Sequence, residues 1–246
     1  MNQAVVLAGG LATRMLPRTA ETPKILLEVA GRPFLSHLLD RLTASGFDHV
    51  VLAVGHLAGP IREVAKAESA ARGLRITLSE DGPRLLGTGG ALRRALPVLE
   101  ETVLVTYGDS YLPFDYLGPL THLRAHASGR GAMAVFANYD SLEPSNVTVG
   151  GGRVRRYDKS RAPGEPLLDH IDYGATALRR SEIESLPQGE PFGLEQLLSF
   201  LALSGGLLAC PVSERFYEIG SPNGLAELNA HLKELTAQLE ERAPRA

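Results

Sequence analysis

The sequence contains a single cysteine, Cys210, so the chain cannot form an internal disulfide bond. A lone thiol is typical of proteins in a reducing compartment, and we expect a cytoplasmic protein. A surplus of positive charge is also absent, because 25 lysines and arginines stand against 28 acidic residues and give a formal net charge of -3. Proteins that bind nucleic acid through its phosphates usually carry such a surplus. We therefore expect no nucleic-acid partner.

Long hydrophobic runs are missing as well. The N-terminus has no positively charged region and only a short apolar run before Gly9, which is too little for a secretory signal. The apolar stretch 200–212 is broken by serine, glycine and proline, and it falls short of the ~20 residues that a membrane span needs. We expect no membrane contact. With 44% hydrophobic and 22% charged residues, the composition is that of a globular protein.

The first half of the sequence alternates short apolar runs with segments of helical periodicity. In 34–45, leucines recur at the spacing of one helix face. This alternation is typical of successive β-α-β units, and it predicts the α/β class with a mainly parallel sheet. The expected strands are 4–7, 49–54, 74–79 and 102–106, and the expected helices are 34–45, 59–72 and one that begins at residue 90.

The second half has a different pattern. Strands are expected at 131–137 and 171–178, and a hairpin is expected where 146–149 and 153–158 flank Gly150-Gly151-Gly152. Neither a Pro/Ser-rich linker nor an internal repeat marks a domain boundary. We therefore predict a single domain over 1–246, divided into a first lobe (1–130), a second lobe (131–221) and a C-terminal helix (222–246).

Leucines in the tail are spaced alternately three and four residues apart, which is a heptad stripe. The simplest interpretation is a terminal helix that packs on its own domain. The alternative is a helix that pairs with a second subunit in a homodimer, but the stripe is barely two heptads long. The leucines are Leu225, Leu228, Leu232, Leu235 and Leu239.

The first apolar run ends in two glycines, and two cations follow. Gly9-Gly10 lets backbone N–H groups approach an anion closely, although an ordinary tight connection would look the same. Neither the GxxxxGK[ST] loop nor the GxGxxG fingerprint is matched. Arg14 and Lys24 favour an anion site, because two cations on a polar loop suit the spread charge of a triphosphate.

Two other segments also follow predicted strands. Gly87-Thr88-Gly89-Gly90 carries no bulky side chain and would offer a flat backbone to a nucleobase, with a tight turn as the alternative. Asp109 follows the strand 102–106, and ligands of open α/β sheets bind beyond the carboxyl ends of strands. Asp109 alone is most simply a turn residue. Glu218 supplies a second carboxylate, and such a pair suits a hard cation that holds phosphates.

In their order and spacing, the segments LAGG, TR, PK, LGTGGA, GDS and EIGSP resemble the sugar-1-phosphate nucleotidyltransferase family over nearly the whole chain. Among compact members, the chain is most similar to heptose- and mannose-1-phosphate guanylyltransferases. The resemblance implies a Rossmann-like α/β/α sandwich with a mixed, mainly parallel sheet. It also implies Mg²⁺-dependent transfer of a nucleoside monophosphate from a nucleoside triphosphate to a sugar 1-phosphate. GTP with a heptose or mannose 1-phosphate is the leading expectation, and a uridylyltransferase of a hexose or muramate-type 1-phosphate is the alternative.

The resemblance also implies roles for individual residues. Arg14, Lys24 and Asp109 would be catalytic, with Arg14 on the departing pyrophosphate and Lys24 on the α-phosphate or the sugar phosphate. Asp109 and Glu218 would hold Mg²⁺. The expected nucleotide-binding residues are Leu7, Ala8, Gly9, Gly10, Thr13, Gly87, Thr88 and Gly89. The expected sugar-phosphate-binding residues are Asn146, Asp158, Lys159, Tyr173 and Gly174.

Three positions depart from the family pattern. Ala12 and Asn146 stand where glycine is common, and Glu218 stands where aspartate is usual. Ala12 would be strained if its backbone φ had to be positive.

Two other kinds of protein are alternatives to a nucleotidyltransferase. A glycosyltransferase of related fold usually carries an Asp-x-Asp motif, which Gly108-Asp109-Ser110 lacks, and a non-catalytic sensor would be expected to lose Arg14, Lys24 or Asp109.

Overall fold

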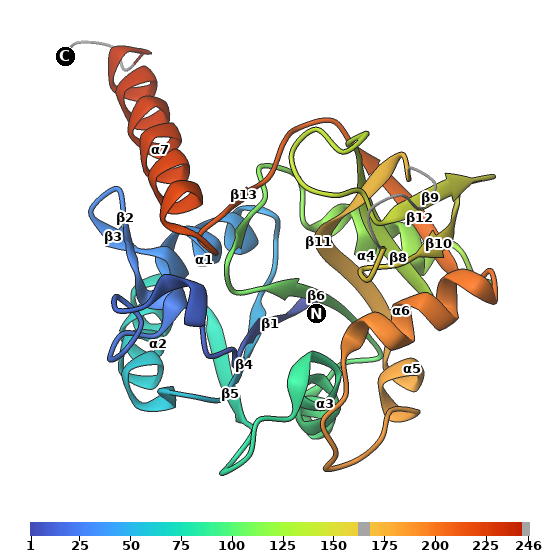
Figure 1. Cartoon of the computed structure of the whole chain (residues 1–246). Helices are drawn as coiled ribbons and strands as arrows, with labels where there is room; N and C mark the ends of the chain where they lie inside the picture. The colour runs from blue at the N-terminus through green and yellow to red at the C-terminus, as the bar shows by residue number, and fades with distance from the viewer. Residues whose placement is uncertain (162–167, 243–246) are drawn as a thin grey trace.

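The computed structural model describes the backbone of residues 1–161 and 168–242, with side chains to residue 238. Within these residues a central sheet of nine strands has the order β5-β4-β1-β6-β11-β8-β12-β10-β9. Helices lie on both of its sides (Figure 1). The strands are β1 (Gln3–Ala8), β4 (His49–Val54), β5 (Arg75–Glu80), β6 (Thr102–Tyr107), β8 (Gly131–Ala137), β9 (Val147–Gly150), β10 (Arg153–Tyr157), β11 (His170–Arg179) and β12 (Leu207–Val212).

The sheet is mixed, as expected. Strands β5, β4, β1 and β6 are parallel neighbours, and β8 is parallel to β12. Strand β11 lies antiparallel between β6 and β8, and it joins the first four strands to the second group. The hairpin of β9 and β10 completes the far edge. The parallel part of the sheet therefore coincides with the alternating first half of the sequence.

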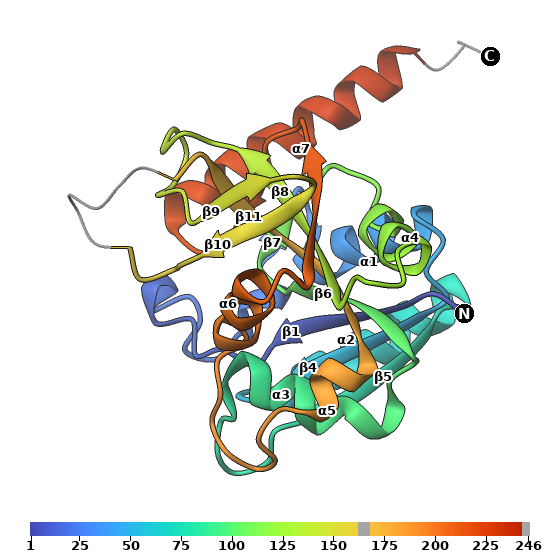
Figure 2. The same cartoon turned by 90° about the vertical axis from the view of Figure 1, so that its right-hand side faces the viewer.

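The sheet separates two hydrophobic cores, because successive side chains of a strand point to opposite faces. In β1, Ala4 and Val6 belong to one core and Val5 and Leu7 to the other. The first core is covered by α1 (Phe34–Ala44), α2 (Ala58–Arg72), α4 (Leu117–Ala125) and α7 (Pro222–Arg242), and the second by α3 (Gly87–Ala95), α5 (Arg180–Glu184) and α6 (Leu194–Leu203). Figure 2 shows α3, α5 and α6 together on one side of the sheet. The α/β/α sandwich is confirmed.

Short elements complete the chain. The 3-10 turns η1 and η2 and the small strands β2 and β3 lie between β1 and α1, and η3 follows α3. The two-residue strands β7 and β13 pair with each other outside the main sheet. The bounds are Thr13–Met15 (η1), Lys24–Leu26 (η2), Glu28–Val29 (β2), Arg32–Pro33 (β3), Leu96–Val98 (η3), Ser110–Tyr111 (β7) and Tyr217–Glu218 (β13).

Most expected elements are confirmed, and the differences have physical causes. Helix α3 begins at Gly87 and not at residue 90, because the glycine-rich segment is itself the first helical turn. The hairpin turn is confirmed, with Gly151 and Gly152 at φ of 59° and 71°. The broken apolar stretch 200–212 contains the end of α6 and all of β12. The helices α4, α5 and α6 and the strand β12 were not predicted from the sequence.

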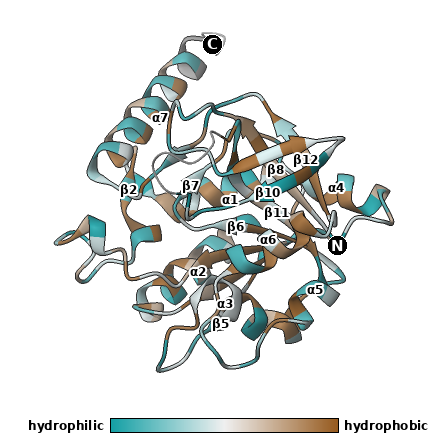
Figure 3. Ribbon diagram, turned by 45° about the vertical axis from the view of Figure 1, so that its right-hand side comes forward, coloured by the Kyte–Doolittle hydropathy of each residue, from teal (hydrophilic) through white to brown (hydrophobic). Residues whose placement is uncertain are grey.

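Helix α7 packs on its own domain through its first half. Leu225, Leu228 and Leu232 are buried, and the Asn229 side chain accepts a hydrogen bond from Ala30 N–H at 2.8 Å. Leu235 is 38% exposed, and the second half of the helix extends away from the body (Figures 1 and 2). Hydrophobic and hydrophilic residues alternate along α7, as Figure 3 shows. The side chain of Leu239 lies outside the described part of the structure. Residues 243–246 lie outside it entirely.

No helix in the described part of the chain is long and apolar enough to cross a membrane.

The loop after β1 contains a left-handed alanine. Ala12 has φ 50° and ψ 39°, and its carbonyl accepts hydrogen bonds from Met15 N–H at 3.0 Å and the Thr19 hydroxyl at 2.9 Å. An alanine in this region costs roughly 1 kcal/mol relative to an ordinary conformation, because Cβ crowds the carbonyl. The two hydrogen bonds hold the turn in place despite this cost. The departure from glycine at this position is therefore a strained variant of the loop.

Ala12→Gly is expected to leave the free energy of unfolding unchanged or to raise it by up to about 1 kcal/mol, because relief of strain exceeds or offsets the added entropy of the unfolded chain. Ala12→Val should lower it by about 1–2 kcal/mol, since a β-branched residue fits this region worse. Ala20, exposed in the same loop and without positive φ, is the matched control. If urea denaturation gives Ala12→Gly a lower free energy of unfolding than Ala20→Gly, the backbone at Ala12 is not strained.

Candidate active site

The carboxyl ends of three parallel strands meet at one edge of the sheet. The register pairs Leu7 with Tyr107 and Ala8 with Val54, so β1, β4 and β6 end level with one another. Gly108 N–H donates to the Leu7 carbonyl at 2.9 Å and fixes the first residue beyond β6 against β1. Ligand-binding loops of open α/β sheets lie at such an edge. The segments that the sequence singled out are therefore brought together here.

The loops enclose a cavity of about 270 Å³. Its lining includes Lys24 and Asp109 as well as Gly87 and Thr88. A Cβ on Gly108 would lie 3.1 Å from the Leu7 carbonyl oxygen and the Ala8 Cβ, so any larger residue would have to push these neighbours apart slightly. Six of the eight residues expected to bind the nucleotide line this cavity: Leu7, Ala8, Gly9, Gly10, Gly87 and Thr88.

Two expected nucleotide residues lie elsewhere. Thr13 is exposed at the start of η1 and does not line the cavity. Gly89 faces protein, because its N–H donates to the Phe192 carbonyl at 2.8 Å and a Cβ would meet the Phe192 ring at 2.6 Å. The Thr88 hydroxyl accepts from Leu194 N–H at 2.8 Å, at the start of α6. Part of the glycine-rich segment thus serves the packing of α3, which the sequence alone did not reveal.

Asp81 is a cavity residue that sequence reasoning missed. Its side chain is buried after β5, and its Oδ2 accepts a hydrogen bond from Leu86 N–H at 3.0 Å. Within the described structure, its Oδ1 has no hydrogen-bond partner. Burial raises the pKa of Asp81, and the Leu86 hydrogen bond and Arg94 oppose this rise. The rule that picked out Asp109, a carboxylate directly after a predicted strand, applies equally to Asp81.

Lys24 and Asp109 form an ion pair beside the cavity. Lys24 Nζ lies 2.6 Å from Asp109 Oδ2, and the two side chains are 17% and 31% exposed. Lys24 opens η2 directly after Pro23, and Asp109 follows β6. The pair joins two loops that are far apart in the sequence. The ammonium group of Lys24 and the carboxylate of Asp109 therefore meet at the wall of the cavity.

The pairing of two short strands, β13 and β7, places Glu218 near the ion pair of Lys24 and Asp109. Strand β13 runs antiparallel to β7, with Glu218 opposite Ser110, and Ile219 N–H donates to the Asp109 carbonyl at 2.9 Å. Burial raises the pKa of Glu218, and the negative charges of Asp109 and Glu143 raise it further, while Lys24 and Arg14 oppose the rise. The ionised form of Glu218 is thus stabilised by a cation.

Arg14 reaches the same point from η1. A Cβ built on Gly220 would lie 3.2 Å from Arg14 Nη2, 3.4 Å from Lys24 Nζ and 3.6 Å from Glu218 Oε2. Both cations and one carboxylate therefore converge on a glycine that leaves room between them. The three residues expected to be catalytic, together with Glu218, form one group.

This group fits Mg²⁺ that arrives with a triphosphate. Mg²⁺ is commonly bound through one or two carboxylates, with phosphate oxygens and water completing its coordination. Asp109 and Glu218 supply two carboxylates, and the burial-raised pKa of Glu218 marks a carboxylate that gains from a nearby cation. Across the described residues, no group of three or more His, Cys, Asp or Glu side chains is placed to hold a metal by itself. Oxygen atoms of the substrate would have to complete the coordination shell of the Mg²⁺ ion.

A second cavity of about 580 Å³ adjoins the first, and both are lined by Tyr107 and Asp109. It lies between the end of β6 and the β9–β11 side of the sheet. Arg14 and Glu218 line it as well. All five residues expected to bind the sugar phosphate line this cavity: Asn146, Asp158, Lys159, Tyr173 and Gly174.

Lys159 is held as a cation in the second cavity. Its Nζ donates to the Tyr107 hydroxyl at 3.3 Å and lies 3.8 Å from Asp172 Oδ2, above the rings of Tyr107 and Tyr157. Burial alone would lower the pKa of Lys159, but Asp172 and Tyr107 together raise it. Asp172 was not predicted from the sequence. It accepts from Tyr157 OH at 3.0 Å and from Gly174 N–H at 2.9 Å.

The other expected sugar-phosphate residues differ in their contacts. Asn146 accepts hydrogen bonds from Asp172 N–H through its side chain and from Asp158 N–H through its carbonyl, both at 2.8 Å, so it positions the lining. Hydrogen bonds from Arg156 and Ser160 lower the pKa of Asp158 to about 2. Tyr173 packs edge-on to Phe114 and Phe216 and is 1% exposed. Its ring forms part of the cavity wall.

Comparison with known proteins gives relatives of matching architecture. A family profile described as "MobA-like NTP transferase domain" matches residues 4–200. The chain is 31% identical to a mannose-1-phosphate guanylyltransferase from Mycobacterium tuberculosis over 78% of its own length and 53% of the relative, so it spans about half of that protein. It is 29% identical to an N-acetylmuramate alpha-1-phosphate uridylyltransferase from Caulobacter vibrioides, over 94% of this chain and 97% of the relative.

Solved structures share the fold. HddC from Yersinia pseudotuberculosis, solved in complex with GMP-PN, superposes with a TM-score of 0.77 at 23% identity, over 94% of this chain and 100% of HddC. A putative glucose-1-phosphate thymidylyltransferase from Bacillus anthracis gives a TM-score of 0.81 at 16% identity, over 94% and 95% of the two chains. The family profile covers well over half of the sequence. The chain therefore belongs to the family of MobA-like NTP transferase domains, and it is a nucleotidyltransferase.

Proposed function

We propose that the protein transfers a nucleoside monophosphate from a nucleoside triphosphate to a sugar 1-phosphate, releasing pyrophosphate and a nucleoside diphosphate sugar. The observation that carries this proposal is the pair of adjoining cavities that share Asp109, with Arg14, Lys24 and Glu218 at their junction. One cavity suits the nucleotide and the other suits the sugar phosphate. The relatives of known name include enzymes that act on such substrates.

The reaction needs no protein nucleophile. An oxygen of the sugar phosphate attacks the α-phosphorus, the bond to the β-phosphate oxygen breaks, and the electron pair leaves with pyrophosphate. Catalysis then consists of alignment and of neutralising the negative charge that develops. Lys24 lines the first cavity, pairs with Asp109, which lines both cavities, and would hold the α-phosphate. Arg14 would hold the departing pyrophosphate, and Lys159 would hold the sugar phosphate. Mg²⁺, held by Asp109 and Glu218, would supply further charge neutralisation.

We propose GTP as the nucleotide and a heptose or mannose 1-phosphate as the acceptor. Asp81 favours guanine, because a carboxylate in the nucleotide cavity can accept from the adjacent N1–H and N2–H₂ donors of that base, whereas uracil offers one N–H. A uridylyltransferase of a hexose or muramate-type 1-phosphate is the second candidate. It is favoured by the uridylyltransferase relative, which matches this chain over almost its full length. A cytoplasmic location stays a prediction, as does a homodimer.

Lys24→Ala and Asp109→Asn are each expected to lower kcat by about 100-fold or more, because each removes a charge from the junction where the transition state gains its charge. The measurement is pyrophosphate release from GTP and mannose 1-phosphate with Mg²⁺. Lys66→Ala is the control, since Lys66 is exposed on α2 and, within the described residues, pairs only with Glu63, at 3.1 Å. Circular dichroism should show all three variants folded. Near-normal turnover by Lys24→Ala would remove that residue from the mechanism.

Asp81→Asn is expected to lower the ratio of kcat/KM for GTP over UTP by about tenfold or more, because a hydrogen bond to a charged acceptor contributes roughly 1.5–3 kcal/mol. The amide keeps the size of the side chain and can still accept from Leu86 N–H. Asp115→Asn is matched to it, because Asp115 is an exposed carboxylate that accepts from Leu117 N–H at 3.0 Å. An unchanged ratio would count against Asp81 as the residue that selects the base.

A further inference from the structure

The second cavity is rich in carboxylates, and its cations are already engaged. Three cations line it: Arg14, Lys159 and Arg161. The carboxylates that line it are Asp109, Glu143, Asp158, Asp172 and Glu218. Apart from the Mg²⁺ that Asp109 and Glu218 would hold, the described lining therefore carries more negative than positive side chains, although a sugar phosphate must bind there.

Each cation has a partner or a phosphate to hold. Arg161 Nη2 donates hydrogen bonds to both carboxylate oxygens of Asp140, at 2.8 and 2.7 Å. The Arg161 side chain is 10% exposed. Lys159 lies against Asp172 and donates to Tyr107. Arg14 stands at the junction of the two cavities, where the phosphates meet. Among the described lining residues, no cation is left for a negative group elsewhere on the sugar.

Glu143 differs from the other carboxylates in its surroundings: like Glu218, it has no hydrogen-bond or ion-pair partner among the described residues, but Glu218 stands with Arg14 and Lys24 around Gly220 at the junction. Asp109 pairs with Lys24, and Asp158 and Asp172 accept hydrogen bonds from protein. Within the described residues, the Glu143 carboxylate has no hydrogen-bond or ion-pair partner. It lines the same cavity as Glu218 and is exposed to solvent. An unpaired, solvent-exposed carboxylate thus lies at the edge of the space where the sugar ring would bind.

The backbone that carries Glu143 is fixed. The buried Asn138 side chain donates to the Glu143 carbonyl at 2.6 Å and to Ser145 Oγ at 2.9 Å. Ser145 N–H donates to Asp140 at 2.7 Å, and Asp140 N–H donates back to Ser145 Oγ at 3.0 Å. Tyr139 and Asp140 are both left-handed, at φ of 47° and 58°, so this network holds an unfavourable turn. A group on a rigid element positions its ligand more strictly than one on a loose loop.

We propose that this cavity selects sugar 1-phosphates whose sugar carries no carboxylate, and that Glu143 is the specificity-determining residue. The inference rests on the proposed transfer to a sugar 1-phosphate. Glu143 accepts hydrogen bonds from sugar hydroxyls and repels a sugar carboxylate. Heptose and mannose meet this requirement. Muramate, whose lactyl group ends in a carboxylate, does not, so the cavity favours the first of the two candidate acceptors.

The test uses pairs of 1-phosphates that differ in a carboxylate: glucose and glucuronic acid, mannose and mannuronic acid, and N-acetylglucosamine and N-acetylmuramic acid. Titration calorimetry gives the affinity of each, and pyrophosphate release with GTP or UTP gives kcat/KM. The wild-type protein should prefer the member without the carboxylate several-fold, because two like charges about 4 Å apart in a solvent-exposed place repel each other by about 1 kcal/mol. Equal or tighter binding of the carboxylate members overturns the inference.

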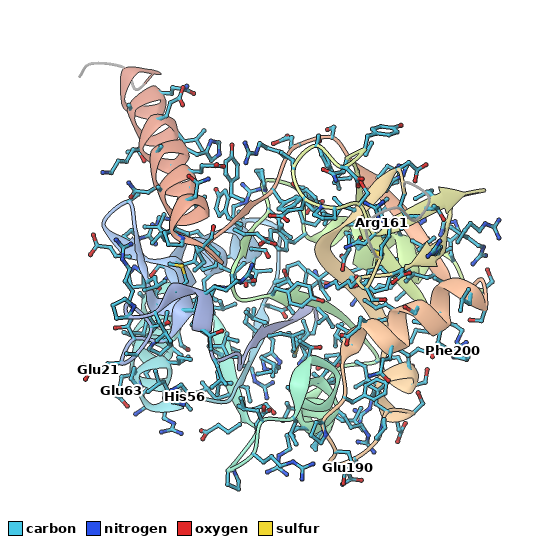
Figure 4. The ribbon with its side chains drawn as sticks, in the orientation of Figure 1. Glu21, His56, Glu63, Arg161, Glu190 and Phe200 are labelled. Carbon is cyan, nitrogen blue, oxygen red and sulfur yellow. The ribbon has the colours of Figure 1, made fainter. Side chains whose placement is uncertain are left out.

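Variants assign the preference to one side chain. Glu143→Gln keeps the size of the side chain and should reduce the ratio of affinities several-fold, and Glu143→Lys should reduce it further or invert it. Glu63→Gln is the control, because Glu63 is exposed on α2, in the other lobe from Arg161 (Figure 4). A ratio that is unchanged in both Glu143 variants overturns the role of Glu143. Absence of pyrophosphate release from every pair, with the binding preference intact, overturns the proposed function alone.

Discussion

The hydrogen bond from Gly108 N–H to the Leu7 carbonyl ties the ends of β1 and β6 together, and the rest of the site depends on that contact. Parallel strands in register end at one edge, so the loops that follow them must share the same space. A Cβ at residue 108 would lie 3.1 Å from the Leu7 carbonyl oxygen and the Ala8 Cβ, so glycine allows the approach with no displacement of these neighbours. Once the loops are this close, Lys24 and Asp109 neutralise each other in a half-buried place, and an unpaired charge there would be costly.

Much of the fold could be predicted because its first half obeys simple rules. Strand β1 is a continuous apolar run, as expected for a strand buried on both faces, and α1 repeats leucine at one helix face. Strand β12 could not be predicted in the same way. Pro211 interrupts it, and proline is disfavoured in central strands. It is tolerated because β10 pairs with β12 only at Leu208, so no β10 hydrogen bond is lost at Pro211.

The site was predicted best where function dictates the residue type. Phosphates call for cations and a metal calls for carboxylates, and the structure brings the four charged residues of the junction together, although their roles stay predictions. Glycines were harder to interpret, because the same residue serves ligand access and packing. Gly89 faces Phe192 and not a cavity, and only the fold shows which neighbour it meets. Asp172 was missed because it lies inside a strand, where nothing in the sequence marks it, whereas Asp81 was missed although it follows a strand as Asp109 does.

The pairing of β13 with β7 has a consequence for how the protein is made. Glu218 follows Asp109 by more than 100 residues along the sequence. During synthesis, the strands that form the first cavity leave the ribosome long before β13 does. A nascent chain can therefore enclose the first cavity while Glu218 is still missing from the junction. The group at the junction is completed only once β13 has emerged, which couples the chemistry of the site to a segment far along the chain from the nucleotide cavity.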